Sequence, residues 1–214
     1  MKMKKIKLLI FLFLISFIFS GCVANNKLIN KNMTKKSYQV AEIIAFQGFQ
    51  NQEYSITKNI LENSGAKVDV FSSKLGKAQS KNGNLTVNIE KTLDDLNVDE
   101  YDAVIFIGGP GAQDFFSDST AHQVAKTTIN KNKVLGAICI APAILANAGV
   151  LKGQNATIWT DPFDKETMIE YLTNWGAIFI DRAVVISGNI ITANGPQASE
   201  EFGAAILKTL SAKN

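Results

Sequence analysis

The residue best suited to covalent chemistry is Cys139, which directly follows the apolar run 134–138 and precedes Ile140-Ala141-Pro142. A cysteine at a sharp strand-to-helix turn is the sulfur counterpart of a nucleophile elbow. The free N–H groups at the start of a helix would stabilise a thiolate and lower the pKa of the thiol. Pro142 suits the first helical position, where its missing N–H costs nothing. The same residues also allow Cys139 to be a small buried hydrophobic side chain between two isoleucines.

A second turn with chemical potential, Gly108-Gly109-Pro110-Gly111, follows the apolar run 103–107. The backbone N–H of Gly109, together with that of Ile140, could bind an oxyanion that forms on a substrate. The glycines are equally consistent with an ordinary tight turn. The spacing matches neither a P-loop nor a dinucleotide fingerprint, so we expect no nucleotide cofactor.

The elements that must position these turns alternate along the chain between apolar strand-like runs and helical patterns. We expect strands at 40–45, 68–71, 103–107, 134–138, 156–159, 177–180 and 184–192. We expect helices at 53–64, ending near Gly65, at 119–130 (exposed), at 141–148, at 164–174, and around Phe202, Ile206 and Leu210. The polar stretch 74–84 is expected to be a loop or short hairpin. Apolar strands separated by helices indicate an α/β fold with a mostly parallel sheet covered on both faces, and ligands then bind beyond the carboxyl ends of the strands.

The N-terminus has the pattern of an export signal. Four lysines precede the apolar run 8–19, and the small residues Ser20-Gly21 lead to Cys22. Phe19-Ser20-Gly21-Cys22 resembles the bacterial lipobox, although Phe19 replaces the usual aliphatic residue. We therefore expect cleavage before Cys22 and lipidation of its sulfur, giving a lipoprotein attached to a membrane. An uncleaved anchor and an ordinary secretory peptide are the alternatives, and each still places the domain outside the cytoplasm.

These observations predict three segments: a signal peptide over 1–21, an Asn- and Lys-rich flexible tether over 22–37, and one globular domain over 38–214. Removal of 21 of the 214 residues leaves 193, and loss of the four lysines takes the formal net charge from +3 to −1. A nearly neutral protein lacks the basic surface expected of a nucleic-acid binder, so nucleic acid is not an expected partner.

The chain from Val40 to Leu210 resembles the DJ-1/PfpI family of the class I glutamine amidotransferase-like superfamily. The resemblance rests on YDAVIFIGGPG, AICIAP and NGPQASEEF, and on GFQNQE from residue 48. It implies a flavodoxin-like three-layer sandwich and a homodimer. It also places Cys139 on the nucleophile of the family and Glu53 on its glutamate, protonated and hydrogen-bonded to the sulfur. Without the resemblance, Glu53 would be read as a first-turn acid that favours the helix dipole.

The sequence departs from this family where many relatives have a histidine. The position after the cysteine is Ile140, and the corresponding position of the other branch is Asp161. Asp161 could move a proton, but a carboxylate is a weak base at neutral pH, and Asp161 could equally be a helix N-cap before Pro162. The single histidine, His122, lies in a polar helical pattern and is expected to be exposed. Peptidase activity and a zinc site are therefore not expected.

The leading functional hypothesis is a membrane-anchored cysteine-dependent hydrolase, glyoxalase or deglycase-like enzyme that acts on a small electrophilic substrate. The alternative is a non-catalytic thiol redox sensor or stress-protection protein, whose partner would be an oxidant. That alternative is open because Cys139 is the only other cysteine, so no internal disulfide forms once Cys22 is acylated. A transporter's binding lipoprotein is a third reading, which the absence of a second lobe disfavours.

Overall fold

The computed structural model describes residues 37–160 and 165–213. Its centre is a seven-stranded sheet with the order β11-β12-β8-β7-β1-β3-β6. All neighbouring strands are parallel except β11, which pairs antiparallel with β12 at one edge. The strands are β1 Gln39–Ile43, β3 Lys67–Ser72, β6 Lys91–Thr92, β7 Ala103–Phe106, β8 Val134–Ile138, β11 Val184–Ser187 and β12 Ile190–Ala193. The predicted mostly parallel sheet is confirmed.

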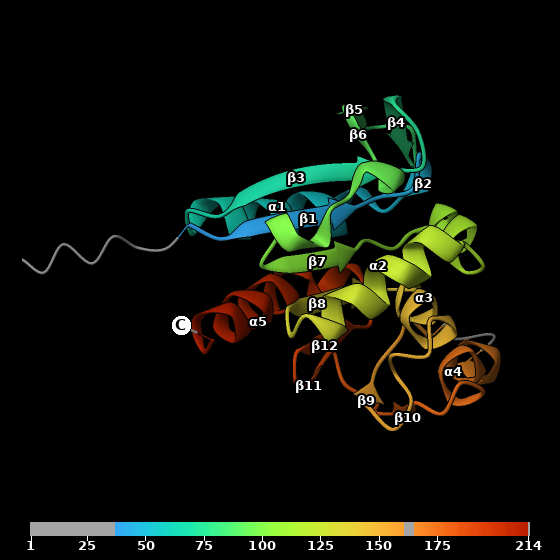
Figure 1. Ribbon diagram of the computed structural model, residues 1–214. Helices are drawn as coiled ribbons and strands as arrows, with labels where there is room; N and C mark the ends of the chain where they lie inside the picture. Colours follow the sequence, from blue (N-terminus) through green and yellow to red (C-terminus); the bar gives the residue numbers. More distant parts are fainter. Residues whose placement is uncertain (1–36, 161–164, 214) are drawn as a thin grey trace, which may run out of the picture. The chain divides into compact units, whose positions relative to one another are not determined.

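Helices cover both faces of this sheet (Figure 1). Helices α1 (Asn51–Asn63) and α5 (Ser199–Ser211) pack against each other on one face. Helices α2 (Ser119–Asn130) and α3 (Pro142–Asn147) cover the other, and α4 (Lys165–Thr173) packs on α3. This is the expected flavodoxin-like three-layer arrangement.

The core forms because the central strands are mostly apolar, and β7 and β8 carry no polar side chain. Strands β7 and β8 are fully buried, as expected for parallel strands with helices on both faces. Gly136 in β8 leaves room for α5, since a Cβ there would lie 3.0 Å from the ring of Phe202. Phe202, Ile206 and Leu210 are all buried, as their spacing predicts.

Two small sheets lie outside the main one. Strand β2 (Gln47–Phe49) pairs parallel with β4 (Gly76–Ser80), which forms an antiparallel hairpin with β5 (Thr86–Ile89). The stretch expected to be a loop or hairpin therefore contributes a hairpin. Strands β9 (Asn155–Ala156) and β10 (Ile178–Phe179) form the other sheet. Short 3₁₀ helices connect the elements at Leu93–Asp95, Val98–Glu100, Pro110–Phe115 (η3) and Pro196–Ala198.

Three expectations for individual elements need correction. Helix α1 begins at Asn51 instead of residue 53, because the Gln50 side chain accepts a hydrogen bond from the Gln52 N–H and caps the helix. The expected strand at 156–159 ends at Ala156, since the N–H of Thr157 is bonded to the Thr192 hydroxyl. Helix α2 has the expected bounds but is not simply exposed, because it buries Ala121, Val124, Ala125 and Thr128.

Within the described residues, no helix has the length and apolar character needed to cross a bilayer. The predicted signal peptide lies outside those residues, as does almost all of the predicted tether.

Candidate functional site

Cys139 forms a strained elbow directly after β8. Its φ angle is +64°, in the left-handed region that residues other than glycine rarely adopt. The elbow is fixed by backbone hydrogen bonds on both sides: the Cys139 N–H donates to Ala193 O at 2.9 Å, and the Trp159 N–H donates to Cys139 O at 2.8 Å. Pro142 begins α3 as predicted. Backbone strain held in place by surrounding bonds is typical of functional sites.

The turn after β7 brings Glu53 to this elbow. The Gly108 N–H donates to Glu53 Oε2 at 3.0 Å, and the Glu53 carboxyl and the Cys139 thiol are near enough for each to shift the pKa of the other. The approach is close: a Cβ on Gly108 would lie 2.4 Å from the Cys139 Cβ and 2.8 Å from Glu53 Oε2. Only glycine fits at this position. Gly108 therefore belongs to a tight turn and to the site at the same time.

Two backbone amides face the sulfur. The N–H groups of Gly109 and Ile140 lie near the Cys139 side chain, and both lower the pKa of the thiol. Gly109 takes a φ of +102°, and a Cβ there would lie 2.4 Å from Gly48 O, so only glycine permits this orientation. The backbone amides of Gly109 and Ile140, which were predicted from the sequence to bind an oxyanion, therefore both lie beside the Cys139 side chain.

The electrostatics of the pair differ in part from the expectation. Burial raises the pKa of Glu53 from 4.5 to about 8, so the carboxyl is mainly protonated at neutral pH, as the family resemblance implies. Burial also raises the pKa of the Cys139 thiol, and the charge of an ionised Glu53 raises it further. The Gly109 and Ile140 amides act in the opposite direction but do not overcome burial. The predicted lowering of the thiol pKa is therefore wrong, because Cys139 is buried, with 8% of the residue exposed, and burial disfavours the charged thiolate.

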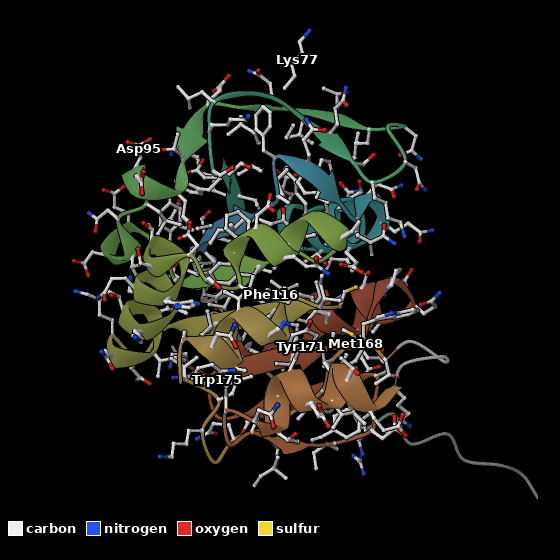
Figure 2. The ribbon with its side chains drawn as sticks, turned by 90° about the vertical axis from the view of Figure 1, so that its right-hand side faces the viewer. Lys77, Asp95, Phe116, Met168, Tyr171 and Trp175 are labelled. Carbon is white, nitrogen blue, oxygen red and sulfur yellow. The ribbon has the colours of Figure 1, made fainter. Side chains whose placement is uncertain are left out.

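Cys139 lies on the wall of a cavity of about 500 Å³. The other described lining residues come from seven parts of the chain: Gln50, Lys81, Gly109, Pro110, Gln113, Phe116, Ile140, Trp159, Thr167, Met168, Tyr171 and Pro196. Phe116 and Tyr171 meet edge to face, with ring centroids 5.5 Å apart. Figure 2 shows these two rings and Met168 lying near one another. A small molecule in this cavity would have direct access to the sulfur.

The remaining predicted residues do not join this group. Asp161, expected as a proton carrier, and Cys22, expected to be lipidated, both lie outside the described residues. His122 is partly buried instead of exposed, because its Nε2 lies 2.9 Å from Phe116 O. Asn147 Nδ2 donates to the same carbonyl at 2.8 Å, and His122 does not line the cavity. No described histidine contacts Cys139.

Several lining residues had no signal in the sequence. Lys81 lies just past β4 in a polar stretch, and nothing in that stretch shows that the hairpin reaches the cavity. Met168 and Tyr171 are three residues apart on α4, so they share a helix face, which sequence reading would assign to the core. Gln50 could have been predicted to lie near the site, because it directly precedes the first residue of α1, the helix that carries Glu53.

Among the described residues, no group of three or more His, Cys, Asp or Glu side chains is placed to bind a metal ion. The chemistry that these residues support is therefore that of a thiol, a carboxyl and two backbone donors.

Comparison with known proteins identifies relatives along most of the chain. A 36% identical protein of unknown function from Methanocaldococcus jannaschii aligns over 97% of this chain and 98% of its own length. A deglycase from Thermococcus kodakarensis is 31% identical over 72% of this chain and 89% of its own. The crystal structure of a ThiJ/PfpI domain protein from Brachyspira murdochii superposes with a TM-score of 0.77 at 32% identity, covering 83% of this chain and 98% of that one. The model of the DJ-1/PfpI family matches residues 39–209. The chain therefore belongs to the DJ-1/PfpI family.

Proposed function

We propose that this protein is a cysteine-dependent enzyme that acts on small electrophilic carbonyl compounds, in the manner of a glyoxalase or deglycase. The observation that carries the proposal is the placement of the Cys139 sulfur on a cavity wall, with the Gly109 and Ile140 N–H groups and the Glu53 carboxyl around it. Membership of a family that includes deglycases supports an enzymatic role.

The first chemical step would be addition of the thiol to the substrate carbonyl. The sulfur forms a bond to the carbonyl carbon, the C=O π bond breaks, and the thiol proton passes to the former carbonyl oxygen to give a hemithioacetal. The Gly109 and Ile140 amides would stabilise the negative charge that develops on that oxygen. With a pKa of about 8, Glu53 is mainly protonated at neutral pH, so its carboxyl would relay the proton by giving its own to the carbonyl oxygen and taking that of the thiol.

The test is consumption of methylglyoxal by the purified protein. Wild type should consume it, and Cys139→Ala should not. His122→Gln should retain the activity, because His122 lies outside the cavity and Asn147 also bonds to its partner, Phe116 O. Equal rates in wild type and Cys139→Ala would refute the proposal. Loss of activity in the well-folded histidine variant would show that the reaction needs a histidine after all.

A thiol redox sensor is the second candidate, supported by Cys139 being the free cysteine of the described residues. The raised thiol pKa weighs on both functions, because the thiolate is the form that peroxide oxidises and also the stronger nucleophile. The two functions are separated by intact-protein mass spectrometry. A sulfinic Cys139 at low peroxide would support the sensor, and an unmodified thiol would support the enzyme.

We also propose that the chain is exported and anchored to a membrane through lipidated Cys22. The charged, apolar and small-residue pattern of 1–22 supports this, and the alignment with the M. jannaschii protein includes more of the chain than the family domain. Cells fed an alkyne analogue of palmitate should label wild type in the membrane fraction but not Cys22→Ser. Labelling that persists in Cys22→Ser would contradict the anchor.

The family resemblance further leads us to propose a homodimer. Light scattering on the purified domain should give twice the mass of one chain.

A further inference from the structure

The cavity beside Cys139 has two chemically different sides. Its apolar residues, Phe116, Met168 and Tyr171, come from the end of η3 and from α4. Of its polar residues, Gln50 and Lys81 come from the start of α1 and the end of β4, and Gln113 and Thr167 come from η3 and α4. In Figure 1 the hairpin and α4 lie apart, with α3, which follows Cys139, between them. A bound molecule would therefore meet an aromatic side and a polar side at once.

Lys81 is the one charged side chain among the described lining residues. It forms no ion pair with any carboxylate in the described part of the chain. The backbone of Lys81 is fixed, because its N–H donates to Phe49 O at 2.8 Å. The residue after Phe49, Gln50, in turn donates its N–H to Gly108 O at 2.9 Å. The backbone of Lys81 is thus held beside the segment 49–50, which is itself bonded to the Gly108 turn, while its exposed side chain lines the cavity.

The charge of Lys81 acts within the site. It lowers the pKa of Glu53, against the larger effect of burial, although the two side chains come from different elements. A positive charge that shifts the pKa of Glu53, the carboxyl beside Cys139, will also attract an anion that approaches the sulfur.

We propose that Lys81 is a specificity-determining residue that selects carbonyl substrates bearing a carboxylate group, such as 2-oxo acids. The carboxylate would lie at the Lys81 ammonium, the carbonyl carbon at the Cys139 sulfur, and any apolar remainder against Tyr171 and Met168. The part of this inference that concerns turnover rests on the proposed function. The attraction of anions to the cavity does not depend on it.

The attraction can be measured without turnover, by alkylation of Cys139 with two reagents of nearly equal size. Iodoacetate is an anion and iodoacetamide is neutral. We expect Lys81→Met to lower the ratio of the iodoacetate rate to the iodoacetamide rate by about 10-fold, as expected for loss of local electrostatic attraction. Lys81→Arg should restore the ratio. Lys77→Met is the matched control, because Lys77 is on the same hairpin but outside the cavity lining, and Figure 2 places it far from Phe116, Met168 and Tyr171. An unchanged ratio in Lys81→Met, or the same fall in Lys77→Met, would overturn the inference.

Turnover of two small aldehydes separates this inference from the proposed function. Glyoxylate carries a carboxylate and methylglyoxal does not. Lys81→Met should raise the ratio of KM for glyoxylate to KM for methylglyoxal about 10-fold. If neither aldehyde is consumed but the alkylation ratio still depends on Lys81, the reaction is wrong and the anion selectivity stands. If both aldehydes are consumed and the ratio is insensitive to Lys81, the selectivity is wrong and the reaction stands.

Discussion

The backbone N–H of Gly108 donates to Oε2 of Glu53 at 3.0 Å, across 55 positions of the chain. This bond joins the turn after β7 to the first turn of α1, and Cys139 lies against both. The other carboxyl oxygen, Oε1, has no conventional hydrogen-bond partner among the described residues. The site is therefore assembled from three segments, the turn after β7, the first turn of α1 and the elbow after β8, and each can be changed by a separate substitution.

Gly108→Ala adds one methyl group but should displace the elbow that carries Cys139. The added Cβ would lie 2.4 Å from the Cys139 Cβ and 2.7 Å from Ile138 O, so the elbow must move. We expect a loss of about 1–3 kcal/mol in the free energy of unfolding, measured with urea, and slower alkylation of Cys139. Gly65→Asn is the control, since that glycine has a φ of +93° and open space around it, and asparagine tolerates this conformation. Equal stability of Gly108→Ala and wild type would show that the turn is less tightly packed.

Cys139→Gly should be more stable than Cys139→Ala. Both remove the sulfur, but glycine adopts the φ of +64° without the steric penalty that a Cβ imposes. We expect a difference of about 1 kcal/mol in the free energy of unfolding, after allowing for the greater backbone entropy of unfolded glycine. A less stable glycine variant would argue against strain at the elbow.

Glu53→Gln should flatten the pH dependence of stability. The carboxyl has a pKa of 4.5 when unfolded and about 8 when folded, so the folded state binds the proton more tightly. Its contribution is fully present below pH 4.5 and is lost as the pH rises to about 8. Each pH unit in this window costs up to about 1.4 kcal/mol of unfolding free energy in wild type. Thermal unfolding from pH 4 to 9 should show wild type losing stability relative to Glu53→Gln, and parallel curves would contradict the raised pKa.

Glu42→Leu should stabilise the domain. Glu42 is in the central strand β1, its side chain is fully buried, and neither carboxyl oxygen has a hydrogen-bond partner among the described residues. Burial raises its pKa, so it is kept as a neutral but unsatisfied acid. An apolar residue removes this penalty, for an expected gain of about 1–3 kcal/mol in unfolding free energy. Glu42→Gln keeps the polar atoms and should gain much less. Destabilisation by leucine would indicate a partner for Glu42.

The sequence predicted the arrangement of the sheet well because its strands are uninterrupted apolar runs. β8 and α2 have the predicted bounds, and the parallel arrangement follows from the helices between the strands. The pairing of Cys139 with Glu53 came from the resemblance to a family, since residues 86 positions apart have no local pattern that links them.

What the sequence could not give is the environment of each group. The thiol pKa was predicted in the wrong direction because burial depends on the segments folded over Cys139, including Trp159 and the η3 turn. The placement of His122 failed for a related reason: an apparently polar helix is in fact half covered, and the histidine ring reaches Phe116 O. Lys81 was missed because its role depends on where the hairpin lies and not on its neighbours in the chain.

The hairpin that carries Lys81 is built outside the main sheet, in the stretch between β3 and β6. On the proposed function, reactivity and substrate preference lie in separable pieces of chain. Exchanging the tip of this hairpin between relatives should then change which compounds react, while the Cys139 elbow beside the main sheet continues to fold.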